Sequence, residues 1–207
     1  DPEIIYIILN VNFKFDSSRT TKEKNTLVTD VNSTLASYNT GSLKSFNKVF
    51  RHSYVSALID DTNTAILSNI TNVTLAKFFT PVSGTTDNTG FNLYFNNAFY
   101  NPHTEHNKAM GGIIGSTGFL VGTDTEESFF DDDGAGNLRR YQGKVTRTYV
   151  DSTAGTVDYT TGYIKVNAIQ ITTVSDVDGL SSTKVRITAI SFSKDIIPIR
   201  NQILELD

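Results

Sequence analysis

The sequence lacks cysteine and tryptophan, and each absence excludes a kind of site. None of the 207 residues is Cys, so a disulfide framework, a Cys-ligated zinc site and a thiol nucleophile are excluded. The missing Trp counts against a carbohydrate-binding surface, because sugar platforms favour large aromatic faces. Long apolar runs are absent as well: the longest, residues 4–9, has the length of a strand, whereas a membrane helix needs about 18 or more apolar residues. We therefore expect no membrane-spanning segment and no membrane partner.

An excess of positive charge is also missing. Lys and Arg total 18 against 22 Asp and Glu, which gives a net charge of −4 and a pI near 5.3. Phosphate binding needs a basic face, and the sequence contains no run rich in Lys or Arg. We expect no nucleic-acid partner.

Catalytic and cofactor-binding motifs are lacking too. The sequence contains neither a glycine-rich phosphate loop followed by Lys-Ser/Thr nor a Gly-x-Ser-x-Gly nucleophile elbow. Glu105 lies between His103 and His106, but metal ligands must be fixed by second-shell partners, this polar loop offers no helix to hold them, and the only other His is His52 among the predicted helices. The prediction is a protein that is not an enzyme and that uses no metal and no cofactor.

An acidic turn at Asp131 and Asp133 partly matches a calcium-binding loop. Ala135 and Gln142 stand at the fifth and twelfth positions of that loop, where oxygen ligands are required. Because Asp and Gly are ordinary turn residues, we predict a hairpin turn on a solvated face. A glycosidase that uses this acidic turn stays open as a weaker alternative to the prediction of a protein without enzymatic activity, since two carboxyls that face one cleft can hydrolyse a glycosidic bond.

The first third of the chain predicts a strand followed by helices. Residues 4–15 become alternately apolar and polar, as in a half-buried strand. Thr20 and Glu23 have the spacing of a capping box, which predicts a helix start. Two shorter helices are predicted over residues 42–50 and 53–59. The apolar residues at helical spacing in the first helix are Leu27, Val28, Val31, Leu35 and Tyr38.

From Ala65 onward the pattern changes to strands separated by turns that contain Gly, Asn or Asp. This predicts an antiparallel meander or sandwich, with residues 151–155 as one of its turns. The predicted strands are 72–79, 91–99, 110–121, 128–130, 138–141, 145–150, 156–159, 163–171 and 184–192. The fold class is therefore α+β. We expect a strand and helix subdomain over residues 1–65, a β-rich body over 66–194 and an extended C-terminal strap over 195–207.

The last segment, residues 195–207, is unusually apolar for the end of a chain. Pro198 lacks a backbone N–H, which suits either an edge strand of this domain or a strap on a neighbouring subunit. The preceding strand 184–192 completes a plausible sheet, so the strap is favoured and the edge strand stays open as the alternative. The expected partner-binding residues of the strap are Pro198, Arg200, Asn201, Ile203, Leu204 and Leu206.

Aromatic residues are densest between Phe91 and Tyr100. Burial in a core is the default explanation for such a cluster. Tyr94 and Tyr100 are also candidates for a subunit interface, where aromatic residues are enriched.

Several stretches together resemble a known family, and they follow its order across nearly the whole chain. They are VNFKFD at 11–16, SYN at 37–39, residues 46–51, residues 53–60, AILSN at 65–69, LYFNN at 93–97, VDYTTG at 157–162 and IPIRNQIL at 197–204. The family is the large baseplate wedge subunit of T-even-type contractile phage tails, also found in marine cyanophages.

The resemblance implies a virion structural protein of the tail baseplate, assembled in the host cytoplasm and without enzymatic activity. It implies that a second copy pairs with the chain in each wedge, and that the pairs join other baseplate wedge proteins in a ring around the hub. Because family members are longer, we expect residues upstream of Asp1. The alternative is a carbohydrate-binding or adhesin-like β-sandwich, motivated by loops rich in Asn and Thr.

Overall fold

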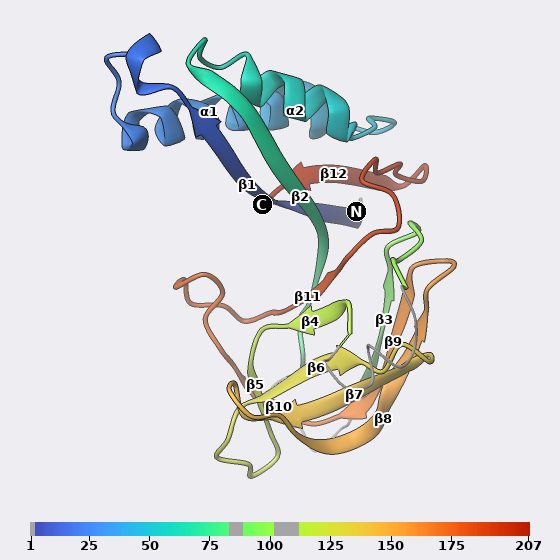
Figure 1. Cartoon of the computed structure of the whole chain (residues 1–207). Coiled ribbons are helices and arrows are strands. Elements are labelled where there is room, and N and C mark those ends of the chain that lie inside the picture. The colour runs from blue at the N-terminus through green and yellow to red at the C-terminus, as the bar shows by residue number, and fades with distance from the viewer. Residues whose placement is uncertain (1–2, 83–88, 102–111) are drawn as a thin grey trace. The chain divides into compact units, whose positions relative to one another are not determined.

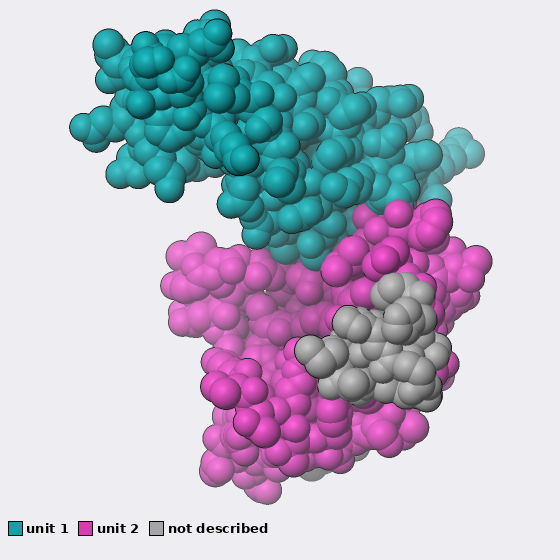
Figure 2. Space-filling model, viewed as in Figure 1, with its two compact units in different colours: residues 1–75, 193–207 teal, residues 76–192 magenta. Residues whose placement is uncertain are grey.

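The computed structural model describes residues 3–82, 89–101 and 112–207, in two compact units. The first unit contains Asp1–Leu75 and Ser193–Asp207, and the second contains Ala76–Phe192 (Figure 2). The first unit is thus built from both ends of the chain, and the two units are described separately. The α+β class predicted from the sequence is confirmed.

Two helices and three strands form the first unit (Figure 1). Its strands follow the order β12-β1-β2, and β12 pairs in parallel with β1. The elements are β1 (Glu3–Phe15), the 3-10 helix η1 (Ser17–Arg19), α1 (Lys24–Tyr38), the π-helical turn η2 (Asn39–Leu43), α2 (His52–Asp60), β2 (Ile66–Phe79) and β12 (Gln202–Leu206). The last residues of β2 belong to the second unit.

The core of the first unit lies between the sheet and its helices. Alternate residues of β1 are buried, so that Ile5 and Ile7 share one face with Leu204 of β12. Leu27 of α1 and Val55 of α2 are also fully buried. Hydrophobic burial of these side chains accounts for the strand and helix periodicity of the sequence.

The predicted capping box is wrong. The N-cap of α1 is Glu23, and it makes no side-chain cap hydrogen bond. The Thr20 hydroxyl instead accepts from the backbone N–H of Lys22, at 3.1 Å. A hydroxyl that bonds two residues ahead in a local turn is not available to a helix that begins later.

The predicted helix over residues 42–50 is also wrong. The first helix ends in the π-helical turn η2, and the next helix begins only at His52. Phe50 forms an isolated antiparallel bridge with Ile196. The apolar spacing that suggested one helix face belongs to a segment whose pairing partner lies far along the chain, which overrides local propensity.

The second unit is an antiparallel β structure, as predicted. Its largest sheet has seven strands in the order β10-β5-β6-β7-β8-β9-β3, and Figure 1 shows its marked curvature. A smaller arrangement has the order β2-β11-β4. The strands are β3 (Thr89–Tyr94), β4 (Ile114–Ser116), β5 (Phe119–Val121), β6 (Ser128–Asp132), β7 (Asn137–Gln142), β8 (Thr148–Asp158), β9 (Tyr163–Ile169), β10 (Ile171–Val174) and β11 (Val185–Ala189).

The turn predicted over residues 151–155 is wrong, because these residues lie inside β8. Gly155 has a packing role instead: a Cβ atom there would come within 2.0 Å of the Lys165 carbonyl oxygen on β9. Glycine thus marks a close approach of two strands rather than a turn. The predicted strand over 110–121 is divided into β4 and β5, and its first two positions lie outside the described residues.

Candidate functional site

The C-terminal segment enters the first unit through the bridge between Phe50 and Ile196. The Phe50 N–H donates to the Ile196 carbonyl at 3.0 Å, and the Ile196 N–H donates to the Phe50 carbonyl at 2.9 Å. The backbone N–H of His52 donates to Oδ1 of Asp195 at 2.8 Å. Both bridge side chains are fully buried. The segment is therefore anchored in the unit before its final strand begins.

The final strand β12 lies at the edge of the sheet and pairs with β1, from Gln202 opposite Glu3 to Leu206 opposite Ile7. Leu204 is fully buried, while Ile203 and Leu206 are half-buried. The structure has the edge strand, which the sequence analysis kept as the alternative, and not the favoured strap on a neighbouring subunit.

The η2 turn covers the outer edge of β12 at Leu206. The Leu206 N–H donates to Oδ1 of Asn39 at 2.9 Å, and Nδ2 of Asn39 donates to the Leu206 carbonyl at 3.3 Å. The Asn39 amide thus takes the place of a neighbouring peptide group. An ion pair between Lys44 and Glu205 adds a second tie. Covering an edge in this way opposes strand addition by another chain.

The turn before β12 is where the tail meets solvent. Arg200 and Asn201 are exposed, and Pro198 is half-buried. The Gln202 N–H donates to the Ile199 carbonyl at 2.9 Å, and the Gln202 side chain accepts from the Ile199 N–H at 3.3 Å. These bonds hold the turn in a defined conformation.

Tyr94 and Tyr100 belong to the second unit, so the structure does not place them in the same unit as the tail. Both rings are partly exposed. The Tyr94 ring stacks on Tyr163, with 4.8 Å between centroids and 26° between planes. The Tyr163 hydroxyl donates to Oδ1 of Asn92 at 2.7 Å.

The acidic hairpin β6–β7 is not a solvated face, and that prediction is wrong. Asp131 is only 1% exposed. Its Oδ1 accepts from Nε of Arg139 at 2.9 Å, and its Oδ2 accepts from Arg147 at 2.6 Å and from the Tyr149 hydroxyl at 2.8 Å. Burial raises the pKa of Asp131, whereas the hydrogen bonds and the two guanidinium groups oppose that shift. The donors lie on and beside the next two strands, so no local pattern around Asp131 shows them.

Asp132 is fully buried too. Its Oδ1 accepts from the Ile114 N–H at 2.8 Å, and its Oδ2 accepts from the Tyr159 hydroxyl at 2.6 Å. Burial, together with this bond to Asp132, raises the pKa of Tyr159 far above its usual range. Both carboxylates are therefore used to fix the second unit internally.

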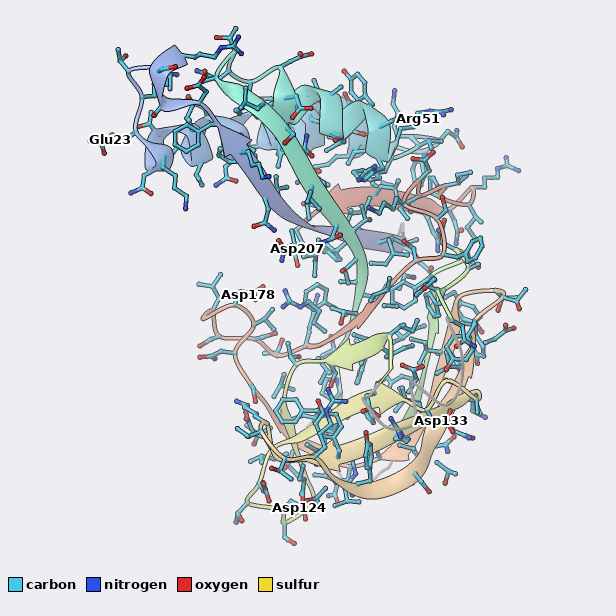
Figure 3. All side chains as sticks on the ribbon, viewed as in Figure 1. Glu23, Arg51, Asp124, Asp133, Asp178 and Asp207 are labelled. Carbon is cyan, nitrogen blue, oxygen red and sulfur yellow. The ribbon has the colours of Figure 1, made fainter. Side chains whose placement is uncertain are left out.

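Asp133 closes the hairpin turn, which confirms the predicted turn (Figure 3). Its Oδ1 accepts from the N–H groups of Ala135 at 2.7 Å and Asn137 at 3.0 Å. Burial alone would raise the pKa of Asp133, but the bonds from Asn137 and Ala135 lower it overall. Gly136, with φ of 102°, supplies the left-handed position that the turn needs.

Metal ligands do not gather in the part of the chain that the structure describes: no group of three or more His, Cys, Asp or Glu residues there could hold an ion. His103, Glu105 and His106, for which no metal site is predicted, lie outside the described residues. No helix in the described ranges is long and apolar enough to cross a membrane.

Two features of the site were missed by sequence reasoning. One is the Asn39 cap, which no local pattern shows because its partner is residue 206. The other is the exposure of Phe46 and Val49, which lie in the segment 42–50 that the sequence predicts as a helix. The signal that could have found it is Asn47, a residue that favours turns and has φ of 62° in the structure.

The described side chains suit a structural protein: the carboxylates of Asp131 and Asp132 bond within the second unit, and partly exposed apolar and aromatic side chains suit contact with other proteins. Residues 3–77 match the family model described as baseplate structural protein gp6, C-terminal domain III. These residues belong to that family, and the protein is a structural component of the phage tail baseplate in the virion and not an enzyme. Over these residues, the resemblance seen in the sequence is thereby confirmed.

The match runs from the start of β1 almost to the end of β2. It therefore covers the N-terminal part of the first unit and two further residues, Ala76 and Lys77. A comparison with curated proteins found no match.

Proposed function

We propose that the chain is a baseplate wedge subunit, that two copies pair in each wedge, and that the pairs join other wedge proteins in a ring around the tail hub. The observation that carries this proposal is the family match over residues 3–77, whose description is that of a baseplate structural protein. Ring assembly requires stable modules that hold contact residues in fixed positions, and both units are sheets with buried cores.

The expected contact residues differ in their exposure to solvent, and this difference supports different roles for them. Leu204 is buried in its own sheet, so it stabilises the first unit rather than a partner. Pro198, Arg200 and Asn201 lie on the hydrogen-bonded turn that faces solvent and are available for contact. Tyr94 and Tyr100 would serve contacts of the second unit, where tyrosine is a favoured interface residue.

Analytical ultracentrifugation of the purified chain, followed by reconstruction of assembled baseplates, tests this proposal. We expect a concentration-dependent dimer in solution and two copies in each wedge. A chain that stays monomeric at all accessible concentrations, together with a single copy in each wedge, would contradict it.

A second candidate function, carbohydrate binding by the second unit, is favoured by one observation. The stacked pair Tyr94 and Tyr163 presents partly exposed aromatic surface beside the amide of Asn92. Aromatic faces next to side-chain amides suit sugar rings, which offer C–H and hydroxyl groups together. A glycan array with the wild type and Tyr94→Ala separates the cases: binding that the substitution abolishes supports this candidate, and an empty array removes it.

A further inference from the structure

Positive charge is concentrated in two segments of the first unit that the structure brings together. Residues 44–51 and 193–201 carry five basic residues and one acidic residue, although the whole chain has a net charge of −4. The bridge between Phe50 and Ile196 places the two segments side by side in antiparallel register. We call the exposed part of these two segments the basic apolar surface.

The bridge also determines which side chains face solvent. Neighbouring residues in extended chains point to opposite sides, so burial of Phe50 and Ile196 turns Val49 and Ile197 outward. Val49 is 36% exposed and Ile197 is 62% exposed. Apolar exposure continues nearby in the same segments, with Phe46 at 48% and Ile199 at 45%. Large apolar side chains rimmed by polar residues mark an interaction site.

Three of the basic side chains on this surface form no ion pair within the described part of the chain. Lys44 is paired with Glu205, and the Asp195 carboxylate accepts from a backbone N–H. None of the described ion pairs involves Lys48, Arg51 or Arg200, all of which are exposed. Arg51 lies just before the start of α2 (Figure 3).

The surface is also held in place before any partner arrives. The two bridge bonds fix one side, and the bonds between Ile199 and Gln202 fix the turn that carries Arg200. Contact residues that are already ordered lose less conformational entropy on binding.

Resting on the proposed function, we propose that the basic apolar surface docks an acidic, partly apolar surface of a different baseplate protein. Two copies that met through this same surface in a two-fold contact would place basic residues against basic residues, which is unfavourable. An acidic partner would neutralise Lys48, Arg51 and Arg200 and cover Val49 and Ile197. Pairing with a second copy therefore uses another part of the chain.

Carbodiimide cross-linking of purified baseplates gives the first test, because this reagent joins Lys amines only to carboxylates that touch them. The cross-link from Lys44 to Glu205 within the chain serves as the internal positive control. We expect Lys48 to be joined to an Asp or Glu of a different protein, which identifies the partner. Lys48 joined to a second copy, or not joined while the control link forms, would overturn the inference.

Charge reversal gives the second test, on the full chain and the partner found by cross-linking. We expect Arg51→Glu with Arg200→Glu to raise the Kd about 10-fold or more at low salt and to slow association. The control is Lys14→Glu with Lys24→Glu, which makes the same change in net charge at exposed positions outside this surface and leaves binding near wild type. Circular dichroism confirms that both variants fold.

Self-association of the same variants separates this inference from the proposed pairing. We expect the ultracentrifugation dimer to be unchanged by reversal of Arg51 and Arg200. A lost dimer with unchanged partner binding would make a second copy the occupant and overturn the inference while upholding the pairing. Partner binding that survives the reversal, with the dimer intact, overturns the inference alone.

Discussion

Replacing Leu204 by Ala tests whether the C-terminal segment is part of the first unit. Leu204 is fully buried and lies opposite Ile5 in the pair of β12 and β1. Removal of a buried leucine side chain costs about 2–5 kcal/mol, which combines lost apolar burial and the remaining cavity. With an m-value of about 2 kcal/mol/M in urea, a loss of about 3 kcal/mol lowers the unfolding midpoint by about 1.5 M.

The matched control is Ile197→Ala, in the same segment but 62% exposed. Its effect on the free energy of unfolding should stay within about 0.5 kcal/mol, as for most surface substitutions. Urea unfolding followed by circular dichroism gives both midpoints, and hydrogen exchange shows whether the loss is confined to the first unit. A Leu204→Ala variant as stable as its control would refute the reasoning and favour a strap on a neighbour.

Three further predictions concern polar groups. Asp131→Asn should destabilise the second unit by about 3 kcal/mol or more, measured by urea unfolding, because the buried guanidinium of Arg139 and the more exposed one of Arg147 lose their counter-charge; a change below about 1 kcal/mol would contradict this. Asn39→Ala should lower stability by about 1–2 kcal/mol and speed hydrogen exchange at the Leu206 amide, which loses its acceptor; unchanged protection at that amide would show that the cap is not needed. The stability of the second unit should fall as pH drops below about 4, because four of its described carboxyl groups, Glu127, Asp133, Asp158 and Asp178, have a lowered pKa, whereas Asp131, with a raised pKa, contributes in the opposite direction. A carboxyl group whose pKa is lower in the folded state than in the unfolded state stabilises the folded state at pH values above its unfolded pKa. This contribution is lost as pH falls through the folded pKa. Urea midpoints at pH 5 and pH 3 measure it, and equal midpoints would be inconsistent with these shifts.

Elements whose cause is local were predictable from the sequence. The alternation in β1 and the helical spacing in α1 each reflect one buried face, which is visible within a few residues. The hairpin turn around Asp133 follows from Asp and Gly as turn residues.

Features whose cause lies far along the chain were not predictable. The apolar spacing of residues 42–50 predicts a helix. The bridge of Phe50 with Ile196, which overrides this local pattern, joins residues that are distant in the sequence. Asp131 was predicted to face solvent as part of an acidic turn. The donors that allow its burial, Arg139 and Arg147, come from later parts of the chain and could not be identified from the residues around Asp131. Burial of a charged group is specified by the partners that fold beside it, not by its neighbours in sequence.

The partner-binding residues illustrate the same limit. The sequence showed that the tail carries too much apolar surface for a fraying terminus, but not which part of it a sheet would bury. Pairing with β1 buries Leu204, whereas the bridge between Phe50 and Ile196 turns Ile197 outward. Partners that are distant in the sequence therefore decide which apolar residues of the tail are buried.

Reconstruction of purified tail baseplates at a resolution that traces β1, α1, α2 and β12 gives both the number of copies in each wedge and the contacts of the C-terminal segment. The account predicts two copies of the chain in each wedge, with the turn that carries Arg200 in contact with an acidic surface of a different protein. A baseplate with one copy in each wedge, or with that turn facing open solvent, would contradict it.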